Sequence, residues 1–256
     1  MGIIQKFFGR KVEAINNYNL VDPELIKEVL NVSIAYNKYG AYCVPLNSQH
    51  RTLNQKILKG DVFEPETIEF MIENVGRGDI IHAGTFFGDF LPALSKALAE
   101  ESRVWAFEPN SKNHRCSQIT LLLNHISNVH LINAGLGEKK SDAEIEIADS
   151  KGRDLGGSSK FVDIPDSKLV TETTRMVTID QVVPINRDVS ILQLDVEAYE
   201  EMALKGALQT IKRTRPILIL EDDHGLTKTR WFKENILSMG YQINGRLHYN
   251  TVVYPN

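Results

Sequence analysis

From Asp79 onward, short apolar runs alternate with segments that have helical periodicity. An apolar run of about 4–8 residues bounded by polar residues is typical of a strand that is buried on both faces. Helices between such strands cover the two faces of a mostly parallel, doubly wound sheet with right-handed connections. The sequence therefore predicts an α/β fold. The predicted strands are residues 80–83, 104–107, 129–133, 190–194 and 217–220, and the first two predicted helices are residues 91–98 and 111–125.

The chain divides into two predicted units, a mainly helical N-terminal extension (1–75) and the α/β domain (76–256). Acid–proline pairs at 22–23 and 64–65 predict two helix starts in the extension, because proline fits the first turn of a helix and an acid can cap it. The polar and aromatic stretch between them, residues 39–60, is predicted to be irregular.

The α/β alternation is interrupted at about residues 137–178, which predicts an insertion or an elaborated crossover near the ligand-binding edge. A Gly/Ser-rich loop at 156–159 is interpreted as a lid in preference to a linker. Asn244-Gly245 predicts a hairpin turn, so that the last strand runs antiparallel to the others. Short strands are expected within the insertion at residues 143–148, 161–164 and 175–177.

Charge and cysteine content narrow the classes of partner. A formal net charge of −4 offers no overall positive field for nucleic acid. Cys43 and Cys116 form no CxxC pair, so neither a zinc site nor a disulfide framework is expected, and a cytoplasmic setting follows. No apolar run approaches the ~18 residues of a membrane span. The apolar segment 1–8 is too short for a signal peptide and is left as a docked terminus or an amphipathic contact.

The segment between the first strand and the first helix carries a glycine turn. Gly84 lets the backbone turn sharply and approach a ligand, and Gly88 relieves crowding at the helix start. A dinucleotide fingerprint would also need glycine at positions 82 and 87, where this chain has His82 and Phe87. A nicotinamide site is therefore disfavoured. A plain strand–helix turn is the alternative interpretation for this segment taken alone.

An acid follows the second strand. Glu108 lies 24 residues after Gly84 and is placed to accept hydrogen bonds from ribose hydroxyls. Pro109 fixes the chain as it leaves the strand. The alternative is that Glu108 only caps the following helix.

Four segments in this order resemble the FkbM family of class I methyltransferases, over about residues 60–225. They are Gly-Asp-Ile-Ile-His-Ala-Gly-Thr-Phe-Phe-Gly, then Ala-Phe-Glu-Pro-Asn, then Asn-Val-His-Leu-Ile-Asn-Ala-Gly-Leu-Gly, then Leu-Gln-Leu-Asp-Val-Glu-Ala-Tyr-Glu. The resemblance implies a Rossmann-like sheet of seven strands and S-adenosylmethionine as cofactor. It assigns His82, Gly84, Thr85, Phe86, Gly88 and Asp89 to the methionine part, Glu108, Pro109 and Asn110 to the ribose, Asn133, Ala134, Gly135 and Leu136 to the adenine, and Asp195 to the reacting end.

The first loop departs from that family at one position, because the family usually has Asp where this chain has His82. A histidine can donate or accept a hydrogen bond through either ring nitrogen. A buried structural histidine is favoured over a cofactor contact.

Carboxylates follow the two later strands. Asp195 ends one strand, and Glu221-Asp222-Asp223-His224 ends the next. Parallel strands end on one rim, so Asp195, Asp222 and Asp223 are predicted to converge, where they can bind Mg²⁺. This pattern is similar to macrocin-type sugar O-methyltransferases, in which such a metal holds substrate oxygens. The alternative is that these acids cap helices or lie on the surface.

The predicted function is methyl transfer to a hydroxyl of a small molecule or sugar. Asp195 and His224 are the candidate catalytic residues, with His224 as general base. Two alternatives stay open, a nicotinamide oxidoreductase and a cofactor-binding module without catalysis. A homo-oligomer is also left open.

Overall fold

The computed structural model describes residues 31–162 and 169–256. The predicted helix start at 22–23, the apolar segment 1–8 and the end of the predicted strand at Ile164 lie outside the described residues. In the described part no helix is long and apolar enough to cross a membrane.

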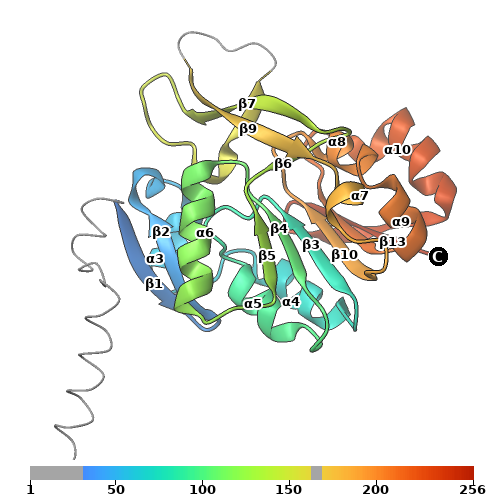
Figure 1. Cartoon of the computed structure of the whole chain (residues 1–256), viewed down its shortest axis with the longest axis horizontal. Coiled ribbons are helices and arrows are strands. Elements are labelled where there is room, and N and C mark those ends of the chain that lie inside the picture. Colours follow the sequence, from blue (N-terminus) through green and yellow to red (C-terminus); the bar gives the residue numbers. More distant parts are fainter. Residues whose placement is uncertain (1–30, 163–168) are drawn as a thin grey trace, which may run out of the picture.

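A seven-stranded sheet forms the centre of the fold, as the sequence predicts (Figure 1). Five neighbouring strands are parallel, and the C-terminal strand runs antiparallel beside the fifth of them. The strand order across the sheet is β12 (Tyr241–Leu247), β13 (Asn250–Pro255), β11 (Ile217–Glu221), β10 (Val189–Leu194), β3 (Asp79–Ala83), β4 (Val104–Phe107) and β5 (Val129–Ile132).

Burial explains why the sequence predicts the five parallel strands. All residues of β3 and β4 are buried, because helices pack on both faces of the sheet. One face packs against α4 (Pro65–Asn74) and α5 (Leu91–Ala97). The other face is covered by α7 (Ile179–Val182), α8 (Glu200–Lys205), α9 (Leu208–Thr214) and α10 (Arg230–Asn235), while α6 (Ser111–Leu123) lies beside β5.

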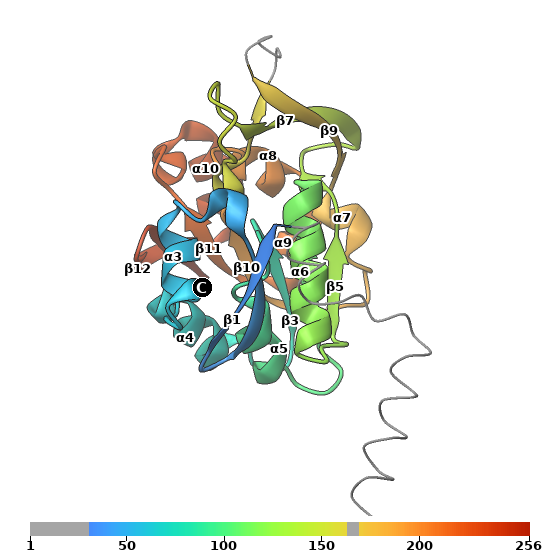
Figure 2. The ribbon, with the colours of Figure 1, turned by 90° about the vertical axis from the view of Figure 1, so that its left-hand side faces the viewer.

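The described part of the N-terminal region contains the helix predicted to start at 64–65, which is α4, but the prediction of irregular structure over 39–60 is wrong. It folds as an antiparallel hairpin, β1 (Val32–Asn37) and β2 (Gly40–Pro45), followed by η1 (Leu46–Ser48) and α3 (Thr52–Leu58). The hairpin lies beside α6 (Figure 2). Side chains of α6 accept hydrogen bonds from the free side of β2, from Cys43 N–H to Thr120 Oγ1 and from Ala41 N–H to Asn124 Oδ1. The helix thus pairs with the free side of β2, as a third strand would. The sequence of the hairpin alone does not reveal this arrangement.

The predicted insertion forms a second, four-stranded sheet, which lies at the top of the molecule in Figure 1. One of its two inner strands, β9, begins five residues earlier than predicted, and these five residues (170–174) pair with residues 143–148 of β7. The strand order is β6 (Gly135–Leu136), β9 (Val170–Val177), β7 (Ser141–Ala148) and β8 (Lys160–Val162), with η2 (Gly156–Ser158) between β7 and β8.

The predicted C-terminal hairpin is present, but its turn is elsewhere. The chain reverses at His248 and Tyr249, after which β13 begins. Asn244 and Gly245 instead lie within β12, where the pairing register shifts, and Gly245 has a φ of +103°. An Asn-Gly pair suits a bulge as well as a turn, because both need a residue in the left-handed region.

Candidate functional site

The glycine turn after β3 interlocks with the ends of two neighbouring strands. Gly84 and Thr85 both donate their N–H to the carbonyl of Phe107 at 3.2 Å. Gly84 has a φ of +85°, and a Cβ atom on it would lie 1.8 Å from the carbonyl oxygen of Asp195. Only glycine therefore allows the ends of β3 and β10 to approach so closely.

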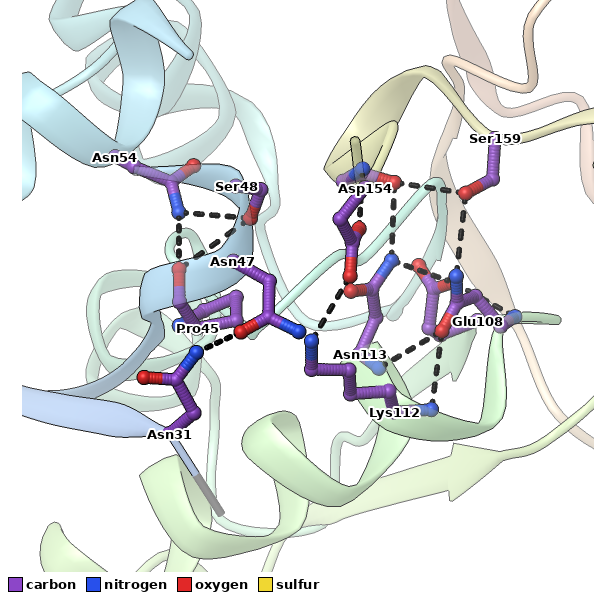
Figure 3. Close-up of polar contacts among 12 residues, drawn as sticks. Asn31, Pro45, Asn47, Ser48, Asn54, Glu108, Lys112, Asn113, Asp154 and Ser159 are labelled. Atoms are coloured by element: carbon purple, nitrogen blue, oxygen red, sulfur yellow. Dashed lines mark hydrogen bonds and ion pairs between the residues drawn. The ribbon is translucent and has the colours of Figure 1, made fainter. Parts of the chain in front are cut away.

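Glu108 lies just beyond β4 and is 4% exposed. One of its carboxylate oxygens accepts the N–H of Phe86 at 2.7 Å, and the other accepts the N–H of Asn110 at 2.9 Å. Asn113, on the first turns of α6, reaches the same carboxylate (Figure 3). Burial raises the pKa of Glu108 to about 8, against the effect of these donors. A ligand hydroxyl can add a further donor, because each carboxylate oxygen has two lone pairs.

A cleft, here named the inner cleft, opens at the carboxyl ends of β3, β4 and β10. Carbon-rich groups line most of it, and Glu108 supplies a carboxylate. Seven of the predicted site residues line it. Phe161 of β8, in the second sheet, and Gly157 and Ser159 of the loop between β7 and β8 line it as well. The lining is Ala83, Gly84, Phe107, Glu108, Pro109, Ala134, Gly135, Leu136, Gly157, Ser159, Phe161, Asp195, Val196 and Glu197.

Other predicted cofactor residues lie behind this lining and support it. Asn133 donates to the carbonyls of Glu108 and Pro109 at 2.9 and 3.1 Å, and Asn110 caps α6. Thr85 Oγ1 donates to the carbonyl of His82 at 3.2 Å. These contacts fix the backbone that forms the cleft.

Three more residues of the first loop, Phe86, Gly88 and Asp89, also lie outside the lining of the inner cleft. Phe86 packs against Phe87, with ring centroids 4.7 Å apart, and lines a neighbouring cleft. Gly88 has a φ of +84° at the approach to α5. Asp89 is 6% exposed, and burial raises its pKa to about 7.

His82 is buried in β3 and lines neither of the two clefts at the sheet edge. Its Nδ1 atom shares a hydrogen bond with Gln193 on β10, and its ring stacks on Phe90 with centroids 5.2 Å apart. Burial lowers its pKa to about 4, so the ring is neutral at physiological pH. These contacts agree with the favoured interpretation of His82 as a buried structural histidine, which packs between strand and helix.

A second cleft, here named the outer cleft, adjoins the inner cleft and shares Gly84, Gly157, Asp195 and Glu197 with it. Four carboxylates and three aromatic rings line it, together with the guanidinium of Arg51. The full lining is Arg51, Thr52, Leu53, Phe63, Glu64, Gly84, Phe86, Gly157, Ser158, Asp195, Glu197, Glu221 and Tyr249.

Asp195 and Glu221 form a close carboxyl pair in this cleft. Burial, and next the charge of Glu221, raise the pKa of Asp195 well above its ordinary value. Two carboxyls that share a site cannot both ionise easily, which is why the charge of Glu221 adds to the effect of burial on Asp195. Burial also raises the pKa of Glu64 and of Glu197.

The other residues predicted after β11 do not reach Asp195. Asp222 turns toward Thr227, whose hydroxyl and N–H both donate to it. Asp223 is exposed, 3.8 Å from Arg246, and His224 is exposed and lines neither cleft. The structure therefore does not bring His224, Asp222 and Asp223 together with Asp195, as a catalytic base and metal ligands at that position would require.

Glu221 takes the position that the sequence had given to its neighbours, because β11 extends one residue further than predicted. Within residues 31–162 and 169–256, no three His, Cys, Asp or Glu side chains are grouped to hold a metal ion. Arg51, Glu64 and Tyr249 were not anticipated either, since they come from parts of the chain outside the parallel strands.

The comparison of the sequence with protein families decides the family. The profile described as Methyltransferase FkbM domain matches residues 75–243. The chain belongs to the FkbM methyltransferase family. The members of this family are methyltransferases that depend on S-adenosylmethionine, so the match argues against the nicotinamide alternative. Among curated protein sequences, none matches significantly.

The chain is similar to several solved methyltransferase structures, and the first of them shares its fold. The chain is 22% identical to methyltransferase FkbM from Methylobacillus flagellatus, with a TM-score of 0.50, over 70% of this chain and 43% of that one. It is 10% identical to the tRNA (uracil-54, C5)-methyltransferase of Pyrococcus abyssi, crystallised with S-adenosyl-L-homocysteine, with a TM-score of 0.45, over 87% and 43% of the two chains. For an S-adenosylmethionine-dependent methyltransferase from Aquifex aeolicus the values are 17%, 0.39, 75% and 89%. The chain thus spans less than half of the length of the first two.

The residues that line the inner cleft have chemistry that suits S-adenosylmethionine, the cofactor of the FkbM family. Gly135 lies where a Cβ atom would be 2.4 Å from Phe161 and 2.7 Å from Met176, so the backbone itself forms the cleft wall. Glu108 places a hydrogen-bond acceptor at the end of β4, where nucleoside hydroxyls bind in doubly wound folds. Phe107, Leu136 and Phe161 supply apolar surface for a flat base.

Proposed function

We propose that the protein O-methylates a hydroxyl of a small molecule or sugar, with S-adenosylmethionine in the inner cleft and the acceptor in the outer cleft. The observation that carries this proposal is the junction of the two clefts at Gly84, Gly157, Asp195 and Glu197. Methyl transfer needs the accepting atom, the methyl carbon and the sulfur in line, so two ligands must meet end to end. Adjoining clefts support that arrangement.

On this proposal Glu108 accepts hydrogen bonds from the ribose, and the Gly84 turn holds the methionine part. Residues 134–136 lie beside the adenine. When bound, S-adenosylmethionine supplies an electrophilic methyl group. The chain's own contribution is to orient both ligands and to take up the proton of the acceptor.

The Asp195 and Glu221 pair is the proposed proton acceptor. In transfer to a hydroxyl, an oxygen–carbon bond forms, the sulfur–carbon bond breaks, and the hydroxyl proton leaves. An ionised carboxylate of the pair takes that proton, and a pKa raised above the ordinary value, as at Asp195, makes a carboxylate a stronger base than an exposed one.

The chemistry of the outer cleft supports a hydroxyl-rich acceptor. Its four carboxylates accept hydrogen bonds, and Phe63, Phe86 and Tyr249 offer aromatic faces. A sugar presents hydroxyl donors and patches of C–H groups, which match this combination. We also propose a cytoplasmic setting, because the thiols of Cys43 and Cys116 are free and buried.

The test has two stages. Calorimetry with S-adenosylhomocysteine, in EDTA and then with Mg²⁺, measures cofactor binding and any dependence on a metal. Transfer of labelled methyl from S-adenosylmethionine to a panel of monosaccharides and small polyols follows. Fragmentation of the product by mass spectrometry then locates the label, which we expect on oxygen.

Variants assign the proton acceptor. We expect E221Q to bind S-adenosylhomocysteine normally but to lose about 10²–10⁴-fold in turnover, the range for a removed general base. H224N and D223N should retain turnover, because those side chains lie outside both clefts. Label on nitrogen or carbon would contradict O-methylation. Cofactor binding without transfer to any acceptor would favour the non-catalytic alternative, and a loss in H224N equal to that in E221Q would restore His224 as the base.

A further inference from the structure

Residues 154–159, here named the strap, connect β7 to β8 and lie over both clefts. Gly157 of the strap lines the inner cleft and the outer cleft alike, while Ser159 lines the inner and Ser158 the outer. Most of the strap is partly exposed, and only Gly156 is buried. A segment with so little buried apolar surface is held in place mainly by its polar contacts.

On the inner side, three residues at the start of α6 hold the strap (Figure 3). Lys112 forms an ion pair with Asp154 at 2.9 Å. Asn113 Nδ2 donates to the carbonyl of Gly156 at 3.1 Å, and Asn110 Nδ2 donates to Ser159 Oγ at 3.2 Å. These residues follow Glu108 directly, so the strap is joined to the wall of the inner cleft.

On the outer side, Arg51 holds the strap through its backbone. Arg51, just before α3, donates through Nε and Nη2 to the carbonyl of Leu155, at 2.9 and 2.7 Å. Two donors from one planar guanidinium fix both the position and the direction of that carbonyl. Next to it, a Cβ atom on Gly156 would lie 3.0 Å from Phe86 and from Ser48, so the turn packs tightly against the outer cleft.

Arg51 lines the outer cleft and is absent from the lining of the inner cleft. We propose that Arg51 is a positioning residue that seats the strap through the carbonyl of Leu155 and thereby sets the affinity of the inner cleft for the cofactor, which Arg51 does not touch. This inference rests on the assignment of the inner cleft to S-adenosylmethionine. It does not depend on which atom of the acceptor is methylated.

Calorimetry with S-adenosylhomocysteine tests the inference on the full chain. We expect R51A to weaken binding about tenfold, since tenfold corresponds to about 1.4 kcal/mol and a charged hydrogen bond is worth about that much. R51K retains the charge and one donor, so its affinity should lie between those of R51A and the wild type. R230A is the matched control, because Arg230 is exposed, pairs only with Glu234 in the same helix, and should bind as the wild type does.

Limited proteolysis gives a readout of strap position that does not depend on affinity. Lys151, Arg153 and Lys160 flank the strap and are exposed, so trypsin can cut on both sides of it. We expect R51A to be cut at these three sites several-fold faster than the wild type, and S-adenosylhomocysteine to slow the cuts in both proteins. A cut at other sites in R51A would indicate global unfolding, in which case R51K carries the comparison.

Each outcome decides the inference. Unchanged affinity in R51A and R51K, with the wild type binding normally, overturns the role of Arg51 and leaves the proposed function standing. Weakened binding with unchanged cutting at the strap overturns the strap as the means of action. A wild type that does not bind S-adenosylhomocysteine overturns the cofactor assignment of the inner cleft and this inference with it.

Discussion

At the scale of single residues, burial sets the proton affinity of several carboxyl groups. Glu200, at the start of α8, is 4% exposed and accepts the N–H of Val196 at 3.0 Å. Burial raises its pKa to about 7, from an ordinary value of 4.5. Between these two values the folded chain holds a proton that the unfolded chain has released. The free energy of unfolding should therefore fall as the pH rises from 4.5 to about 7.

We expect E200Q to reduce that fall, because glutamine stays neutral at every pH and its carbonyl can still accept the N–H of Val196. The contribution removed is on the order of 1–3 kcal/mol between pH 5 and pH 7. Urea unfolding of wild type and variant across this range measures it. The adjacent E201Q is the control, because Glu201 is about one-third exposed and pairs with Lys205. Equal pH profiles for the wild type and E200Q would contradict the prediction.

Glu108 combines two roles that a substitution can separate. Its carboxylate accepts two backbone N–H groups, and on our proposal it also accepts the ribose hydroxyls. We expect E108Q to weaken binding of S-adenosylhomocysteine by about tenfold or more, because an amide nitrogen then faces a backbone donor. Calorimetry measures the loss. E138Q, at an exposed position, should bind as the wild type does. Undiminished affinity in E108Q would remove Glu108 from the cofactor site.

At the scale of elements, the Gly84 turn depends on both backbone conformation and space. Gly84 and Gly152 have similar φ values, +85° and +73°, but only Gly84 is crowded. A Cβ atom on Gly152 would meet nothing within 4 Å. The two glycines therefore separate the cost of a left-handed backbone from the cost of a clash.

We expect G152A to lower the free energy of unfolding by about 1 kcal/mol, the cost of left-handed backbone alone. G84A should lower it by about 2–4 kcal/mol, because the new methyl group must displace the end of β10. Urea unfolding gives both values. G84A should also lose affinity for S-adenosylhomocysteine, while G152A should not. Equal stability losses in the two variants would show that the turn tolerates a side chain.

The elements also show what the sequence can and cannot reveal. The parallel strands were predicted almost to the residue, because strands buried on both faces are mostly apolar, as 80–83 apart from His82 and 104–107 are. The hairpin of β1 and β2 was missed, because its backbone pairs with side chains of α6 far along the chain. Asp222 was predicted in the site and Glu221 was missed, because the strand ends one residue later than predicted. A shift of one residue exchanges the side chain that faces the cleft.

At the scale of the whole molecule, the two ends of the parallel strands have different roles. Both clefts lie at the carboxyl ends of the parallel strands. At the amino ends of the strands, Asp79 is the first residue of β3 and is 1% exposed. Its carboxylate connects three parts of the chain. It accepts hydrogen bonds from Trp105 Nε1 at 2.7 Å and Arg103 N–H at 2.8 Å, and it pairs with Arg187.

We expect D79N to lower the free energy of unfolding by about 3 kcal/mol, because it breaks a buried ion pair while Arg187 keeps its charge. Affinity for S-adenosylhomocysteine should stay at the wild-type value at temperatures where the variant is folded, since Asp79 lines neither cleft. Urea unfolding and calorimetry measure the two quantities. E234Q, which breaks an exposed pair with Arg230, should change stability little. A loss of affinity in D79N that follows its loss of stability would show that the amino and carboxyl ends of the strands are coupled. It would refute the assignment of stability to one end and ligand binding to the other.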